Sequence, residues 1–345
     1  LKFADFVAYE VLRPANLKPS DQIKLLQKQG FKVVNSIILG KIDAETLTKL
    51  FEDRRNKSKY TLDGLVLNID KPYKQSKDTP KYRVSFKTVY ADQIAKTKVI
   101  DIQWNASKNG TLTPRISIEP VKVSGVNVKW VTGHNAKFVV SNGIGPGTVI
   151  ELIRSGDVIP KVHKVLKKTK TKMPDVDYIW DKNKVEIQLL DKKSDPIVKV
   201  KRISHFFKVL GVDFFSKKLV ERFINHGLSS IFKIVRASKD DFMEIDGIQD
   251  RMASKIRNNI DEAISKVDLA RLMYASGVFP EDMGSKRFSK IVENIPNICK
   301  TDLSKEEVIR KIIKIEGFST KTATMFAEGL PKFKKFLKVM PSNIK

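Results

Sequence analysis

Residues 96–168 are a succession of short apolar segments: VIDIQW (99–104), RISIEPVKV (115–123), VNVKWV (126–131), KFVV (137–140), TVIELI (148–153) and VIPKVHKV (158–165). Valine and isoleucine dominate these segments, and glycine and proline punctuate them. β-Branched residues favour strands, whereas glycine and proline mark the turns that join strands. Five or so short strands within roughly 70 residues predict a small β-barrel.

The residues before this barrel mix helix and strand patterns. Residues 21–30 (DQIKLLQKQG) predict a helix that ends at a glycine, and residues 44–55 predict a second helix. Strands are predicted at 31–34, 36–39, 62–69 and 82–89. This part of the chain is therefore expected to be an α+β segment.

After the barrel, residues 170–201 are polar and interrupted by proline, with one predicted strand, VEIQLL (185–190). From Ile203 onward the pattern becomes helical, and a repeat appears. An apolar-x-Gly-apolar turn followed by a helix recurs at Val209–Val212, Ile245–Ile248, Ala275–Val278 and Ile315–Phe318. A single glycine of this kind is most simply a helix C-cap, but four in series predict tandem helix-hairpin-helix motifs.

Such glycine turns let backbone N–H groups and a helix N-terminus approach a phosphate closely, without contact to the bases. Basic residues follow each turn and are expected to contact phosphates as well. The DNA-binding candidates of this region are Gly211, Lys217, Lys218, Gly247, Arg251, Lys255, Gly277, Lys286, Arg287, Gly317 and Lys321.

Composition points the same way. The 345 residues predict two or three domains, and 65 Lys and Arg against 39 Asp and Glu produce a net charge of +26. This field attracts nucleic acid, although Lys-rich solvation of the surface is the plainer alternative. The one cysteine, Cys299, excludes an internal disulfide and a multi-thiolate zinc site and fits a reducing compartment. The longest uncharged stretch, 138–150, is too short and polar to span a bilayer.

The barrel residues also carry a specific resemblance. The blocks 110–128, 132–135 and 145–162 closely resemble the OB-fold domain of bacterial-type NAD-dependent DNA ligases. The matching residues include Gly110, Thr113, Pro114, Glu119, Pro120, His134, Asn135 and Gly156–Lys161. Upstream, FVAY (6–9), LDGLVLNI (62–69) and PKYRVSFK (80–87) resemble motifs of the nucleotidyltransferase domain of that family. The resemblance covers nearly the whole chain.

The resemblance implies a multidomain α+β protein. The expected parts are the C-terminal part of a nucleotidyltransferase domain (1–92), an OB-fold β-barrel (93–168), a metal-free connector in place of a zinc finger (169–202) and an all-α helix-hairpin-helix domain (203–345). The family seals 5′-phosphate/3′-hydroxyl nicks in duplex DNA, with AMP taken from NAD onto a lysine, and Mg²⁺ is expected. Barrel residues Arg154 and Lys161 are further DNA-binding candidates.

The same resemblance assigns site residues. Lys87 is expected to act on the adenylate phosphate, with Arg55 and Asp63 in the same catalytic site, while Tyr9, Val66 and Lys87 contact the nucleotide. An arginine near a helix end is as often a surface residue, and Asp63 has the alternative of a turn aspartate at a strand end. Phosphoryl transfer needs such cations because negative charge accumulates on the reacting group.

Three departures limit the expected activity. The chain has no Lys-x-Asp-Gly, since its Asp-Gly pairs at 63–64 and 246–247 follow Thr61 and Glu244. Asn68 stands where the family has a catalytic lysine, and the four-cysteine zinc module is missing. We also expect no C-terminal BRCT domain, and Leu1 suggests either that something precedes this chain or that it starts unusually.

We therefore expect either one subunit of a split NAD-dependent DNA ligase or a fragment of such an enzyme. Alone it should be inactive, because the adenylated lysine must come from the missing part, which we expect to be a second chain. We expect it in the cytoplasm of a bacterium or an infected host, without membrane contact. The alternative is a non-catalytic, structure-selective DNA-binding protein derived from a ligase, and Asn68 favours it.

Overall fold

The computed structural model describes residues 4–14, 16–73, 82–87, 94–123, 125–153, 160–280 and 283–341. The chain divides into two compact units. The first contains Leu1–Asp101, Ile116–Thr132 and Ile144–Lys170, and the second contains Ile102–Arg115, Gly133–Gly143 and Thr171–Lys345. The predicted domain boundaries at 92, 168 and 202 stay predictions.

In its described residues the N-terminal segment contains two helices and one pair of strands, as expected for an α+β piece. The elements are α1 (Pro19–Lys28), α2 (Ala44–Lys57), β1 (Leu65–Asn68) and β2 (Arg83–Phe86). Helix α2 begins where the Asp43 side chain accepts a hydrogen bond from the Thr46 backbone N–H at 2.8 Å. The two strands are antiparallel, with Leu65 opposite Phe86 and Asn68 opposite Arg83.

The expected strand at 36–39 is wrong. These residues are irregular, and Ile37 and Ile38 remain 49% and 72% exposed, so their apolar pattern does not lead to sheet pairing. Residues 31–34 form one isolated parallel bridge, Ala8 to Val33, instead of a strand. Apolar β-branched runs are therefore a weak strand signal where no neighbouring strand is available.

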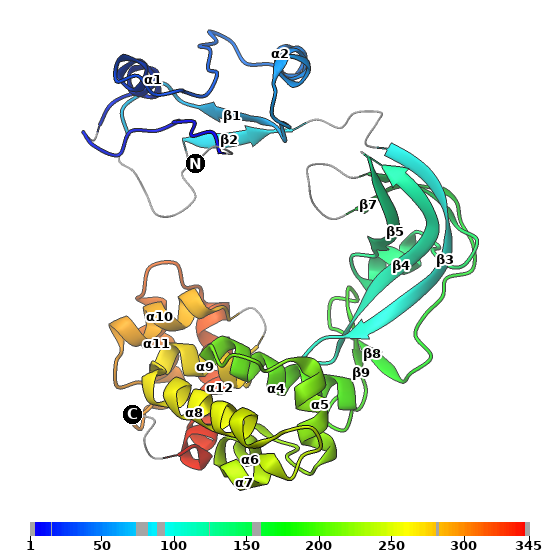
Figure 1. Cartoon of the computed structure of the whole chain (residues 1–345), viewed down its shortest axis with the longest axis vertical. Helices are drawn as coiled ribbons and strands as arrows, with labels where there is room; N and C mark the ends of the chain where they lie inside the picture. The colour runs from blue at the N-terminus through cyan, green and yellow to red at the C-terminus, as the bar shows by residue number, and fades with distance from the viewer. Residues whose placement is uncertain are drawn as a thin grey trace. The chain divides into compact units, whose positions relative to one another are not determined.

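The predicted barrel is confirmed. Its strands are β3 (Ile94–Ala106), β4 (Thr111–Val123), β5 (Val126–Thr132), β6 (Val149–Ile153) and β7 (Lys161–Lys167). They are hydrogen-bonded in the order β3-β6-β7-β5-β4, and pairing of β3 with β4 closes the ring. Figure 1 shows β3 and β4 as its long curved strands. Along most of β4, buried residues such as Ile116 and Ile118 alternate with exposed or partly exposed ones, as a side-chain-filled barrel requires.

One predicted barrel strand is a helix. KFVV lies in α3 (Ala136–Ser141), between β5 and β6. Asn135 precedes it, and its side-chain oxygen accepts a hydrogen bond from the Phe138 backbone N–H at 2.8 Å. Ala136 and Val139, three residues apart, are both fully buried. The N-cap and this helical spacing prevail over the strand preference of two valines.

The predicted strand at 185–190 is also confirmed, as β9 (Ile187–Leu189), which pairs with β8 (Tyr178–Trp180). Strand β9 in turn pairs with the start of β4, where Ile187 lies opposite Leu112. The connector therefore extends the barrel sheet instead of forming a separate body. A small core joins this hairpin to the next helix through Ala106, Leu112, Ala136, Ile187, Leu189 and Val198.

The rest of the second unit is helical, and Figure 1 shows these helices gathered in one body, coloured green to red. They are α4 (Pro196–Leu210), α5 (Lys217–Asn225), α6 (Ile231–Arg236), α7 (Lys239–Met243), α8 (Asp250–Lys266), α9 (Leu269–Ser276), α10 (Ser285–Asn294), α11 (Lys305–Ile313) and α12 (Thr320–Val339). Their common core holds the largest fully buried side chains of the chain, Phe206, Phe207, Phe223, Phe242, Phe288, Phe326 and Phe333.

The four repeats become four pairs of packed helices: α4 with α5, α7 with α8, α9 with α10, and α11 with α12. The repeat glycines Gly211, Gly247, Gly277 and Gly317 have φ of 80°, 69°, 62° and 88°. This left-handed region favours glycine strongly over other residues.

The turns are of two kinds. Gly211 and Gly277 directly cap the first helix of their pair. Gly247 and Gly317 lie in a tight turn, and the second helix begins three residues later, at Asp250 and Thr320. The two kinds alternate, and α4 packs on α9. The helical body therefore contains two successive copies of a four-helix arrangement.

The lone cysteine provides a test of the helical core. Burial raises the pKa of the Cys299 thiol to about 11. At pH 8 the thiolate fraction is then on the order of 0.1%, against about 10% for a thiol of pKa 9. We expect a disulfide reagent such as DTNB to label the native protein about 100-fold more slowly than the protein unfolded in guanidinium. Equal rates would show that the segment around Cys299 is open in solution.

Candidate functional site

Asp63, Gly64 and Lys87 meet at one end of the β1–β2 pair. Because Leu65 lies opposite Phe86, the next positions outward are Gly64 and Lys87. The Lys87 ammonium forms an ion pair with the Asp63 carboxylate. A β-carbon on Gly64 would lie 2.6 Å from the Phe86 carbonyl oxygen and 3.0 Å from Cγ of Lys87. The glycine is needed here because any side chain would push the two strands apart.

The ion pair leaves Lys87 available for a ligand. The side chains of Lys87 and Asp63 are 46% and 52% exposed. Ion pairs at such exposure contribute at most about 1 kcal/mol, since water screens both charges. Lys87 can therefore exchange the carboxylate for a phosphate oxygen at little cost. Without a ligand, the ion pair with Asp63 keeps the ammonium at this end of the strands.

Val66 lies on the same sheet face as Lys87. Alternate residues of a strand share a face, and Val66 is opposite Ser85, two residues before Lys87. The Val66 side chain is 63% exposed, so this face offers an apolar surface next to a cation. The arrangement fits a nucleotide, because a base needs an apolar surface and its phosphate needs a positive charge.

Tyr9 is held by the backbone of its neighbour. The Ala8 N–H donates to the Lys32 carbonyl at 2.8 Å, and the Val34 N–H donates to the Ala8 carbonyl at 3.0 Å. Ala8 is buried, while the Tyr9 side chain is 64% exposed. Arg55 lies on a different element, in the last turn of α2, and is partly buried. The structure thus brings together Asp63, Lys87 and the Val66 face.

Arg83 was missed by the sequence-based assignment. Its Nε donates to Oδ1 of Asn68 at 2.8 Å, and its Nη2 lies 3.3 Å from Oε1 of Glu10. The expected loss of positive charge at Asn68 is therefore accompanied by a guanidinium on the facing strand. Only the β1–β2 register reveals this, because Asn68 and Arg83 are 15 residues apart in the chain.

The predicted cations of the helical body occupy a repeated position. Lys218, Arg251, Lys286 and Lys321 are each the second residue of the second helix of a pair, in α5, α8, α10 and α12. All four side chains are exposed. Lys217 and Arg287 flank them in α5 and α10, and Lys255 lies one turn further along α8, with its ammonium 5.8 Å from the centre of the Phe214 ring.

This position is unfavourable for a cation. A helix N-terminus carries a partial positive charge, so acidic residues stabilise the first turn and basic ones destabilise it by a few tenths of a kcal/mol or more. Helices α5, α10 and α12 have no acidic residue in the first turn. Helix α8 does have one, Asp250. Within the described residues, Lys218, Arg251, Lys286 and Lys321 make no hydrogen bond or ion pair through their side chains. Three of the four first turns thus carry a cation without an acidic residue, which leaves these cations open to an anionic ligand.

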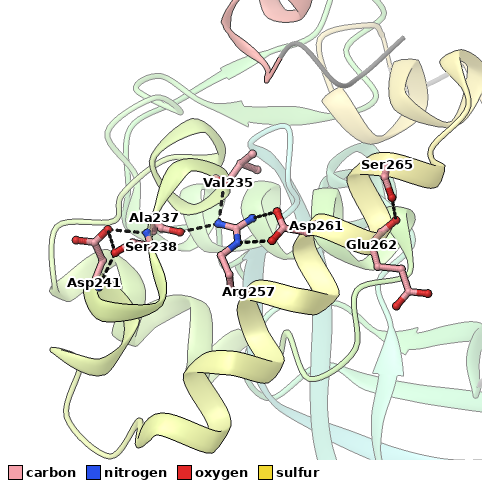
Figure 2. A network of polar contacts seen from close by, with 8 residues as sticks. All are labelled: Val235, Ala237, Ser238, Asp241, Arg257, Asp261, Glu262 and Ser265. Atoms are coloured by element: carbon pink, nitrogen blue, oxygen red, sulfur yellow. Dashed lines mark hydrogen bonds and ion pairs between the residues drawn. The ribbon is translucent and has the colours of Figure 1, made fainter.

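Other cations of the same body hold the fold together. Figure 2 shows Arg257 of α8, whose Nη1 donates to the Val235 and Ala237 carbonyls at 2.9 Å and 2.6 Å. Its Nε and Nη2 bind both carboxylate oxygens of Asp261, at 3.0 Å and 2.7 Å. The neighbouring Ser238–Asp241 capping box closes the start of α7. Arg257 is therefore fully engaged in structure, in contrast to the cations that begin the helices.

In the barrel, Lys161 is exposed at the start of β7, opposite Ile153 and Thr132. Arg154 lies outside the described residues. Across the described ranges, no group of three or more His, Cys, Asp or Glu side chains is placed to hold a metal ion. None of the helices in those ranges is long and apolar enough to cross a membrane.

Comparison with known proteins identifies the barrel. Residues 96–174 match the family model described as the NAD-dependent DNA ligase OB-fold domain. A protein named DNA ligase from Acanthamoeba polyphaga mimivirus is 37% identical over 346 residues, which cover 99% of this chain and 54% of that protein. The chain is a homologue of NAD-dependent DNA ligases.

More distant relatives agree with this assignment. The putative DNA ligase 205R of Invertebrate iridescent virus 6 is 27% identical over 93% of this chain and 52% of its own length. A DNA ligase of Psychromonas ingrahamii is 27% identical over 82% of this chain and 44% of its own length. This ligase homologue thus spans about half the length of the curated relatives that it matches. The resemblance found in the sequence is confirmed.

Gly64 provides a test of the strand pair. We expect Gly64→Ala to cost about 1–3 kcal/mol, because its β-carbon overlaps the Phe86 carbonyl oxygen. Hydrogen exchange measured by mass spectrometry should show faster exchange in peptides that cover 63–68 and 83–87. Gly40→Ala is the matched control, since nothing lies within 4 Å of a β-carbon there. Equal exchange in the two variants would mean that the strands are not paired as described.

Proposed function

We propose that this chain forms the DNA-holding and active-site-completing part of an NAD-dependent DNA ligase, which seals 5′-phosphate/3′-hydroxyl nicks in duplex DNA. The observation that carries the proposal is the exposed cation at the second residue of four helices, each next to a glycine turn, in a homologue of DNA ligases. Duplex DNA is the polyanion that such a repeated pattern fits best.

In this proposal the four helix pairs act as tandem helix-hairpin-helix motifs. Their cations and glycine turns contact the sugar–phosphate backbone and not the bases, so binding is independent of sequence. Lys161, together with Arg154, adds backbone contacts from the barrel. A broken duplex suits this mode of binding, because a nick has no fixed sequence while its backbone is always present.

At the strand pair, Lys87 binds the adenylate phosphate, and Asp63 positions the Lys87 ammonium. Val66 and Tyr9 offer surfaces to the nucleotide, and Arg55 adds positive charge from α2. Mg²⁺ supplies further neutralisation of phosphate charge when it is bound. The lysine that carries AMP lies outside these 345 residues, either in a preceding segment of the same polypeptide or in a second subunit with a Lys-x-Asp-Gly motif.

The second candidate function is a non-catalytic, structure-selective DNA-binding protein descended from a ligase. Asn68 favours it, because its amide carries no charge and its oxygen is engaged by Arg83. Against it stands the Lys87–Asp63 pair, together with the apolar Val66 face, which a pure binding protein does not need. The two candidates differ in one respect that an experiment can measure, namely whether Lys87 contributes to a reaction.

Sealing of a nick whose 5′-phosphate already carries AMP distinguishes the two candidate functions. The chain is tested with Mg²⁺, alone and fused to the upstream half of the mimivirus relative, since the last sealing step needs no adenylated lysine. We expect sealing, and Lys87→Ala should lower its rate about 10²–10³-fold, as loss of a charge-stabilising contact does. Lys49→Ala is the control, because Lys49 forms an exposed ion pair with Glu45 on α2. Tight nick binding without sealing in any arrangement supports the second candidate.

Binding itself should depend steeply on salt. If six to ten phosphates are contacted, affinity for a nicked duplex should fall roughly 10³–10⁵-fold between 50 and 200 mM salt, because each contact releases condensed counterions. Fluorescence anisotropy with a labelled duplex measures this directly. A weak and salt-insensitive interaction contradicts both candidate functions.

A further inference from the structure

Two of the glycine turns have a cation from the preceding helix pair packed against them. A β-carbon on Gly247 would lie 2.9 Å from Nη2 of Arg222, which comes from α5. A β-carbon on Gly317 would lie 3.9 Å from Nζ of Lys290, which comes from α10. In both cases the charged group reaches a turn in the next pair. At Gly247 the absence of a side chain leaves the space that Arg222 occupies, whereas Lys290 lies at ordinary contact distance from a β-carbon on Gly317.

The two arrangements are equivalent by position. Arg222 lies five residues after Lys217, the first residue of α5, and Lys290 lies five residues after Ser285, the first residue of α10. The turns also share their backbone hydrogen bonds. The N–H groups of Ile248 and Phe318 donate to the carbonyls of Ile245 and Ile315, at 2.9 Å and 3.2 Å. The same charge is therefore placed at the same kind of turn in both copies of the four-helix arrangement.

Within the described structure, the side chains of Arg222 and Lys290 do not stabilise the fold through polar contacts. In the described part of the chain, the side chains of Arg222 and Lys290 form no hydrogen bond or ion pair. Arg271 is the contrasting case: it lies near Gly211 in a similar way, but its Nε donates to the Val209 carbonyl at 2.6 Å and so fastens the end of α4. A cation kept against a backbone turn without a protein partner has its donors free for a ligand.

We propose that Arg222 and Lys290 each bind a DNA backbone phosphate at the glycine turn of the following helix pair. Each of these two phosphate sites then draws on two helix pairs. The helix after the turn contributes Arg251 or Lys321 at its second position, and the preceding pair contributes Arg222 or Lys290. The inference rests on the proposed DNA binding and names the residues that determine it. Each site therefore requires that the two helix pairs contributing to it are packed together.

The test uses the full chain and a fluorescent nicked duplex, with affinity measured by anisotropy over a series of KCl concentrations. Arg222→Ala and Lys290→Ala should each reduce the slope of log K against log[salt] by about 0.9, and the double variant by about 1.8, since one phosphate contact is lost at each site. Arg222→Lys should keep the wild-type slope. Lys266→Ala is the control, because Lys266 is an exposed cation already paired with Glu262, and its slope should be unchanged.

The outcomes are distinct. Unchanged slopes for both alanine variants overturn the inference, even if the wild-type protein binds steeply. A lower melting temperature with an unchanged slope also overturns it, because the two cations would then be structural. Absence of salt-dependent binding by the wild-type protein overturns the proposed function itself. Reduced slopes with unchanged melting support the inference.

Discussion

Repulsion between cations and helix N-termini is the constraint on which the helical half of this protein depends. Lys218, Arg251, Lys286 and Lys321 lie where the helix dipole opposes a positive charge, and the described protein residues offer them no acidic partner. An excess of 26 positive charges adds to the same repulsion. The fold tolerates it because a phenylalanine-rich core holds the helix pairs together. In the proposed function a bound polyanion relieves this repulsion, so we expect the helical body to be more stable with DNA than without it.

The N-terminal segment depends on a different interaction. Its candidate site depends on close approach of two short strands at Gly64, which brings Lys87 to Asp63 and leaves Val66 exposed on the same face. The charges here are paired but weakly so, which suits the proposed exchange of Asp63 for a nucleotide phosphate. In the proposed function the two parts of the chain would therefore bind phosphate differently: the helical body through unpaired cations, and the strand pair through a lysine that is ion-paired with a carboxylate when no ligand is bound.

Sequence-based prediction succeeded where the signal is local. The helices at 21–30 and 44–55 appear as α1 and α2, and the punctuated β-branched runs appear as a closed barrel. It failed where a local pattern was overruled. KFVV has strand composition, yet Asn135 caps it into a helix with Ala136 and Val139 buried. The run SIIL at 36–39 is also apolar and β-branched, yet it pairs with no neighbouring strand. Strand propensity is a weak predictor by itself. An N-cap or an available neighbouring strand decides whether such a run becomes a helix, a strand or irregular structure.

The sequence by itself determined the repeat of glycine turns, the cations that follow them, the barrel and the resemblance to NAD-dependent DNA ligases, because each is written in contiguous residues. Only the tertiary structure decided that Arg83 faces Asn68, that Arg222 and Lys290 lie against Gly247 and Gly317, and that Arg257 serves the fold. These contacts join residues 15 to 27 positions apart in the chain. Their geometry follows from strand register and core packing, which no local pattern encodes.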